Sequence, residues 1–264
     1  MIDFSAVLST LVKVATSIFS KKEAPTPQVT TTVDVKPLVN TTGLKKEKIS
    51  SIINVFETGS IKGDYANISI YNDGLNGRKQ ITYGRSQVTQ DGGNLKKLLE
   101  MYIKDGGIYS EKFQPYLAKM GDGNLYKDIQ FLNYLKTAAK EDPIMISAQD
   151  KIFDERYWKP AYAWFQANGF KTNLSMLVIY DSFVHSGSIL DFLRKRFDEV
   201  PPIKGGDEKK WITQYTNTRK TWLANHSNRV LRNTVYRANC FLDQIQKNNW
   251  NLDGEINANG VKVP

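Results

Sequence analysis

The feature that most constrains this chain is a helix that leads directly into a small hairpin, within residues 49–95. From Ile49 onward, apolar side chains recur at helical spacing. We expect this helix to end on Glu57, because Thr, Gly and Ser follow at residues 58–60 and this combination stops a helix. A carboxylate is therefore expected at the end of a rigid element.

A hairpin with a second carboxylate is expected next. Two strand-like runs, residues 66–72 and 80–85, flank residues 73–77, which read Asp-Gly-Leu-Asn-Gly and contain two strong turn dipeptides. This spacing puts Asp73 at the first corner of the hairpin. Two acids on rigid elements across a cleft are what glycoside hydrolysis needs. The alternative is purely structural, because most Asp-Gly pairs are only turns and most Glu residues near helix ends are solvated.

The rest of the chain is predominantly helical. Residues 173–186 are the most continuously apolar stretch, and we expect them to form the central buried helix. Further helices are expected at residues 94–102, 111–120, 125–140, 144–168, 189–196 and, as one or two helices, 208–247. The tail, residues 248–264, is expected to be irregular. These patterns predict an α+β fold that is mainly α, with one small sheet beside the candidate acids.

The first twenty residues are apolar but do not form a typical membrane span. They are too short and are interrupted by Lys13. A secretory signal begins with positive charge, whereas Asp3 is the only early charge here, so no clear signal peptide is present. An amphipathic surface anchor or a packing helix fits better, and residues 1–22 are the candidate contact to a membrane surface or a virion.

A linker is expected between this segment and the globular part. Residues 23–43 are rich in Thr, Pro and Val and have almost no helical period. We therefore divide the chain into residues 1–43, an N-terminal apolar helix with an extended linker, and residues 44–264, the domain that carries the candidate acids.

The composition narrows the classes of partner and cofactor. A formal charge of +9 and a pI near 9.3 point to an anionic partner: a wall polymer, a membrane surface or nucleic acid. No aromatic-interleaved basic motif of a nucleic-acid module is present, so no nucleic-acid partner is expected. Nucleic-acid binding by the basic segment 219–237 is kept as the alternative. Cys240 is the only cysteine, so an intrachain disulfide is excluded. We expect Cys240 to be buried as a small hydrophobic residue. With two histidines and no ligand spacing, no metal or cofactor is expected.

Asp181 lies inside the most apolar run, where a carboxylate is costly to bury unless it is paired. Its partner is expected among the arginines of the C-terminal helices, which are Arg219, Arg229, Arg232 and Arg237. Such an ion pair could hold core helices together or orient the candidate acid. His185 follows on the same helix and could act with Ser182 or Ser186, but without a nucleophile elbow it is expected to be a core residue.

Side chains around the hairpin are candidate contacts to a sugar or to a catalytic water. Thr82, on the second strand, could hold a water against the candidate base, although threonine is also a plain strand former. Tyr65, Tyr83, Arg85 and Gln87 lie near the same end of the hairpin, and we expect them to contact the substrate.

Three stretches of the chain resemble the chitosanase family, which belongs to the lysozyme-like superfamily. The first is the helix ending in Glu57, followed by the hairpin with Asp73 and by Gly84. The second, residues 148–170 (AQDKIFDERYWKPAYAWFQANGF), is similar to the family's aromatic-x-Pro-Ala helix. The third, residues 179–187 (IYDSFVHSG), is similar to the family's Tyr-Asp helix that closes on His and Gly.

The resemblance implies a lysozyme-like, two-lobed helical fold with a small antiparallel sheet lining a cleft, and an endo-acting, inverting glycoside hydrolase. It implies that Glu57, with a pKa raised by partial burial, is the general acid and that Asp73 is the general base. Because the hairpin differs from the family pattern, Asp64 is the alternative base. The resemblance also implies that Thr82 positions the water.

The resemblance further implies a buried network in which Asp181 pairs with an arginine, for which Arg219 is favoured. The substrate of such an enzyme would be an amino-sugar polysaccharide. The basic charge and the missing signal favour peptidoglycan and a lysin that acts on the cell wall, extracellular or virion-associated, with a phage-borne lysin as one such protein. Chitosan is the alternative substrate, and an inactive carbohydrate-binding or structural module is the second alternative.

Overall fold

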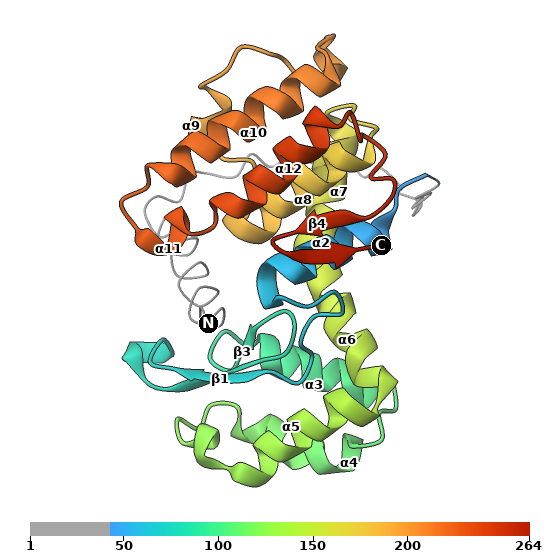
Figure 1. Cartoon of the computed structure of the whole chain (residues 1–264). Helices are drawn as coiled ribbons and strands as arrows, with labels where there is room; N and C mark the ends of the chain where they lie inside the picture. Colours follow the sequence, from blue (N-terminus) through green and yellow to red (C-terminus); the bar gives the residue numbers. More distant parts are fainter. Residues whose placement is uncertain (1–42) are drawn as a thin grey trace, which may run out of the picture.

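The computed structural model describes residues 43–264, so the predicted N-terminal helix and nearly all of the predicted linker lie outside it. The described residues form two lobes (Figure 1), each around its own cluster of buried apolar side chains. The first lobe holds α2 (Lys46–Thr58), α7 (Lys159–Ala167), α8 (Asn173–Ser186), α9 (Asp191–Arg194), α10 (Glu208–Ala224), α11 (Arg229–Arg232), α12 (Val235–Gln246), β4 (Ile256–Ala258) and β5 (Val261–Val263). The second holds β1 (Ile68–Tyr71), β2 (Gln80–Tyr83), β3 (Val88–Thr89), α3 (Asn94–Lys104), α4 (Ser110–Phe113), α5 (Ile129–Glu141) and α6 (Pro143–Phe153). The predicted α+β, mainly α architecture with two lobes is confirmed.

One long helical segment joins the lobes. It was predicted as a single helix over residues 144–168 and consists of α6, a π-helical turn η4 (Asp154–Trp158) and α7 without a break. Ile152 belongs to the core of the second lobe and the next residue, Phe153, to that of the first. The segment therefore passes from one core to the other within one residue, and the extra residue of the π turn lies at that junction.

Helix α2 forms where the apolar spacing predicted it. Ile49, Ile52, Ile53 and Phe56 are buried in the core of the first lobe. The helix ends because Gly59 adopts a left-handed conformation with φ of 73° and donates its N–H to the carbonyl of Val55. Glu57 is consequently fixed in the last turn.

The three-stranded sheet is antiparallel, in the order β1-β2-β3, and it has two different faces. Ile81 and Tyr83 of β2 point into the core of the second lobe. Because side chains alternate along a strand, Gln80 and Thr82 lie on the opposite face, and Ser69 and Tyr71 of β1 stand directly across from Thr82 and Gln80 on that face. One face of the sheet is therefore apolar and the other polar.

Helix α8 is the central buried helix, as predicted. Every residue from Asn173 to Phe183 is buried. The Thr172 side chain accepts a hydrogen bond from the Ser175 N–H at the N-terminus, and Gly187, with φ of 78°, ends the helix. A polar side chain on this helix must therefore find its partner inside the lobe.

The C-terminal tail is not irregular. Strands β4 and β5 form a hairpin that packs against α2 and α12. Its turn, Asn259-Gly260, has φ values of 51° and 90°, as a two-residue hairpin turn requires. The expected helical stretch 208–247 is divided into α10, α11 and α12. Between residues 43 and 264, no helix has both the length and the apolar composition needed to cross a membrane.

Candidate active site

Glu57 is held at the end of α2 by the C-terminal helix α12. Its side chain is buried, and its carboxylate is ion-paired with the guanidinium of Arg237. The preceding carbonyl, that of Phe56, accepts hydrogen bonds from the Tyr236 hydroxyl (2.8 Å) and from Arg237 (3.4 Å). The last turn of α2 and the carboxylate that it carries are thus fixed by two consecutive residues of α12.

Arg237 connects Glu57 to Asp181, which is fully buried on α8. Asp181 accepts a hydrogen bond from Arg237 at 2.8 Å through one carboxylate oxygen and one from Arg219 of α10 at 2.5 Å through the other. The chain Glu57–Arg237–Asp181–Arg219 alternates in charge and contains two carboxylates and two guanidinium groups. Burial disfavours the charge of Arg237, but Glu57 and Asp181 raise its pKa well above the ordinary value.

Arg219, the partner of Asp181 favoured from the sequence, is one of the two found, and Arg237 is the other. The link that Arg237 makes between Asp181 and Glu57 has no signal in the sequence. Arg237 was one of four candidate arginines, and only the helix packing distinguishes it from the others.

Asp73 lies at the start of the hairpin turn and is partly buried. One of its carboxylate oxygens, Oδ1, accepts a hydrogen bond of 3.1 Å from the side-chain amide of Gln80 on β2. Gln80 is on the polar face of the sheet, so the candidate base is attached to that face.

Thr82 lies on the same polar face, two residues from Gln80. Its hydroxyl is buried and has no hydrogen-bond partner within the part of the chain that the structure describes. The same is true of the Tyr71 hydroxyl, which belongs to the facing strand β1. A buried hydroxyl without a partner can bind a water molecule or a substrate group, so the position fits the water-positioning role expected for Thr82.

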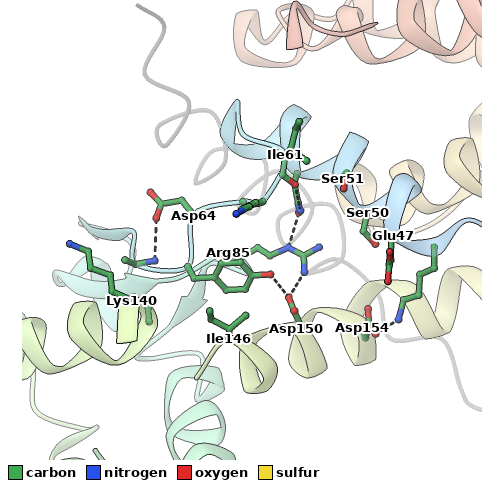
Figure 2. Close-up of a pocket in the computed structure, with 17 residues that line it drawn as sticks. Glu47, Ser50, Ser51, Ile61, Asp64, Arg85, Lys140, Ile146, Asp150 and Asp154 are labelled. Atoms are coloured by element: carbon green, nitrogen blue, oxygen red, sulfur yellow. Dashed lines mark hydrogen bonds and ion pairs between the residues drawn. The ribbon is translucent and has the colours of Figure 1, made fainter. Parts of the chain in front are cut away.

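Asp64, the alternative base, has a different setting. It is exposed, and it accepts a hydrogen bond of 3.1 Å from the backbone N–H of Ala66, which is an ordinary turn contact. Asp64 lines a hollow of about 870 Å³ between α2 and α6, at the junction of the lobes (Figure 2). Neither Glu57 nor Asp73 lines this hollow.

Arg85, expected to contact the substrate, holds the two lobes together. Its guanidinium donates to Asn54 of α2 at 2.7 Å, is ion-paired with Asp150 of α6, and lies 4.4 Å from the ring centre of Phe153. Figure 2 shows its side chain extending between α2 and α6 toward Asp150. Two of its nitrogens are therefore used within the protein, but Arg85 also lines the hollow between α2 and α6, so its contact with the substrate stays a prediction.

Tyr83 is also a structural residue. Its side chain is fully buried, and its hydroxyl donates to the carbonyl of Leu135 at 2.7 Å. A ring without exposed surface cannot contact a sugar, so this expectation was wrong. The sequence contains a signal for this burial. Side chains alternate along β2, so Tyr83 lies on the same apolar face as Ile81.

The other two expected contacts remain accessible in part. The Tyr65 hydroxyl donates to Asp150 at 2.7 Å, and burial together with this bond raises its pKa to about 12. Gln87 has a φ of 49° and donates to the carbonyl of Gly84 at 3.0 Å, and its side-chain oxygen has no partner among residues 43–264. Sugar contact by these two residues stays a prediction.

His185 and Cys240 have the structural roles expected from the sequence. The Thr234 hydroxyl donates to the carbonyl of Leu231, so His185 donates its Nε2–H to that hydroxyl (3.1 Å). Burial, with Arg237 and Arg219 nearby, lowers the pKa of His185 well below its ordinary value. Cys240 is buried, which raises its pKa to about 12. In the described part of the chain, no cluster of His, Cys, Asp or Glu is arranged to hold a metal ion.

Comparison with known proteins assigns the chain to a family. The profile of glycosyl hydrolase family 46 matches residues 51–256. The chain belongs to glycosyl hydrolase family 46. It is therefore a glycosidase, and the resemblance to chitosanases noted in the sequence is confirmed.

Individual relatives of this family 46 chain are chitosanases. The chain is 28% identical over 232 residues to a chitosanase of Bacillus subtilis (strain 168), which covers 81% of each sequence. The native chitosanase of Bacillus subtilis MY002 superposes with a TM-score of 0.66 at 25% identity, over 84% of this chain and 100% of that one. A family 46 chitosanase of Gynuella sunshinyii, solved with chitotetraose, gives a TM-score of 0.63 at 21% identity, over 82% and 95% of the two chains.

Proposed function

We propose that this family 46 glycosidase hydrolyses the β-1,4 bonds of chitosan within the polymer, with Glu57 as general acid and Asp73 as general base. The observation that carries the proposal is the setting of the two carboxylates. Glu57 is fixed on the Arg237–Asp181–Arg219 network at a helix end, and Asp73 is fixed on the polar face of the sheet. The candidate acid thus belongs to the first lobe and the candidate base to the second.

The proposed mechanism is a single displacement with inversion. In its protonated form, Glu57 donates its proton to the glycosidic oxygen as the bond to the anomeric carbon breaks. On the opposite face of the sugar, Asp73 takes a proton from a water molecule as its oxygen attacks that carbon. An inverting pair requires about 6.5–9.5 Å between the carboxyl groups, so that the water fits between base and sugar. We propose the Thr82 hydroxyl as the group that holds this water.

Chitosan replaces peptidoglycan as the favoured substrate. The charge of +9 favoured an anionic polymer in the sequence analysis, but the relatives support the opposite choice. The Bacillus and Gynuella proteins are chitosanases, and two solved relatives contain chitotetraose or six glucosamine units. Net charge is a property of the whole surface, and a polycation is recognised by the groups that face it locally.

The substrate is tested by measuring reducing-end release from chitosan and lysis of purified peptidoglycan with the same wild-type preparation. We expect release from chitosan and no lysis. Lysis without chitosan cleavage would restore the peptidoglycan hypothesis. If neither polymer is cleaved while both are bound, the chain is a binding module that has kept the fold, which would contradict the proposal.

We propose an extracellular location for this enzyme on the same basis. Chitosan and peptidoglycan are both outside the cytoplasm of the cells that contain them, so an enzyme for either acts extracellularly. Finding the protein in the culture medium or on a virion would agree with this proposal, and finding it only inside the producing cells would contradict it.

A further inference from the structure

We propose that Gln80 is a positioning residue, which fixes the carboxylate of the candidate base Asp73 and selects the oxygen that takes the proton from water. This inference rests on the proposed function, because it concerns how Asp73 works. Gln80 is only 5% exposed, so its side chain is part of the framework beneath the site.

The orientation of the Gln80 amide is determined by its partners. Its oxygen Oε1 accepts a hydrogen bond of 2.9 Å from the backbone N–H of Asp91. A backbone N–H can only donate, so the amide NH₂ group must point the other way, toward Asp73 Oδ1 at 3.1 Å. Rotating the amide would break both contacts, and the donor therefore stays directed at Asp73.

Asp91 also holds the turn that follows Asp73. Its carboxylate accepts hydrogen bonds from the backbone N–H of Leu75 (2.7 Å) and from Arg78 Nε (2.9 Å). A Cβ atom on Gly74 would lie 2.3 Å from Asp91 Oδ2, so only glycine lets the turn approach so closely. Asp91 thus fixes the backbone that follows Asp73 directly. It fixes the side chain of Asp73 indirectly, through Gln80.

This arrangement assigns different tasks to the two oxygens of Asp73. Oδ1 holds the amide of Gln80, and we therefore assign Oδ2 as the oxygen that receives the proton of the attacking water. The arrangement also distinguishes the two candidate bases. Asp73 is oriented by a buried side-chain donor, whereas Asp64 is exposed and, within residues 43–264, accepts only from the nearby Ala66 N–H.

The kinetic test is Gln80→Met, which keeps the side-chain length and removes both hydrogen bonds. We expect kcat on chitosan to fall about 10- to 100-fold and KM to change less than about two-fold, because misorientation of a catalytic group acts on the chemical step. The matched control is Gln90→Met. Gln90 is a buried glutamine of the same lobe whose amide donates to the carbonyls of Met120 and Asp122 and not to Asp73. An equal loss of kcat in both variants would mean a merely structural role and would overturn the proposal.

Two further variants separate positioning from folding. In the background of Asp73→Asn, Gln80→Met should lower the residual kcat by less than about two-fold, because Gln80 acts through Asp73. In Gln80→Glu, the new side chain can donate to Asp73 only when it is protonated, so activity relative to wild type should recover as the pH falls. A full additional loss in the double variant, or no recovery in acid, would contradict the proposal.

A measurement without substrate distinguishes this inference from the proposed function. The ¹³C chemical shift of the Asp73 carboxyl carbon at pH 7 should change in Gln80→Met and stay constant in Gln90→Met. If wild type cleaves no polymer but the shift changes, the proposed function is wrong and the positioning contact is real. If the shift does not change, the positioning role is wrong whatever the enzyme cleaves.

Discussion

Glu57 and Arg237 form a buried ion pair between residues that are 180 positions apart in the sequence. The carboxylate lies in the last turn of α2, and the guanidinium comes from α12. The orientation of the candidate acid therefore depends on the packing of the C-terminal helices against α2 and α8. This one contact therefore joins the packing of the first lobe to the position of the candidate acid.

Arg237→Met is predicted to destabilise the protein strongly. It would leave Glu57 and Asp181 buried without the guanidinium they share, and breaking a buried pair in this way costs about 3–5 kcal/mol. The free energy of unfolding in urea measures the loss. The control is Lys247→Met, which removes an exposed pair with Asp243 and should cost less than about 1 kcal/mol. Similar losses for the two variants would contradict this view of the network.

His185 is predicted to make the protein sensitive to acid. Burial, with Arg237 and Arg219 nearby, lowers its pKa in the folded state, while the unfolded chain binds the proton near pH 6.5. Its contribution to stability is complete above pH 6.5 and is lost as the pH falls below that value, because the unfolded state then binds more protons. The loss amounts to at most about 1.4 kcal/mol per pH unit.

The measurement for His185 is the free energy of unfolding at pH 7.5 and at pH 5.0, for wild type and for His185→Gln. Wild type should lose more stability between the two values than the variant does. Equal losses would show that His185 does not contribute to the acid sensitivity.

Gly84→Ala is predicted to cost more than Gly59→Ala. Both glycines have left-handed backbones, with φ of 72° and 73°, so both changes carry the same strain of about 1–2 kcal/mol. Within the part of the chain that the structure describes, only the Cβ at Gly84 would meet another atom, Gln149 Oε1, at 2.1 Å. That oxygen accepts the N–H of Arg85, and disturbing this buried bond adds about 1–3 kcal/mol.

Thermal or urea unfolding of the two alanine variants checks this prediction. No atom of the described residues lies within 4 Å of a Cβ at Gly59, so the Gly59→Ala variant isolates the backbone strain. Equal losses would mean that Gln149 moves aside at no cost.

The local part of the fold could be predicted from the sequence, because its signals are local. The end of α2 on a glycine, the position of Asp73 at a turn and the limits of α8 each depend on neighbouring residues. The β4–β5 hairpin was missed because its strands have three residues each and too little alternation to recognise, although its Asn259-Gly260 turn was a usable signal.

The contacts between distant elements could not be predicted in the same way. Four arginines of the C-terminal helices were candidates in the sequence, with Arg219 favoured, and the pairing of Asp181 with both Arg219 and Arg237 depends on which helix faces pack toward it. Arg85 appeared as a polar residue beside a candidate site, but the approach of α2 and α6 uses its guanidinium for the lobe junction.

The central claim, that Glu57 and Asp73 are the acid and base, is tested most directly by the kcat for chitosan hydrolysis of Glu57→Gln and Asp73→Asn, measured on protein shown to be folded. Each change is predicted to lower kcat by about 10²–10⁴-fold, the contribution typical of a general acid or base. Asp64→Asn is the matched control and should keep kcat within about two-fold. A Glu57→Gln or Asp73→Asn variant that remains folded and retains kcat within about ten-fold of wild type would contradict the account.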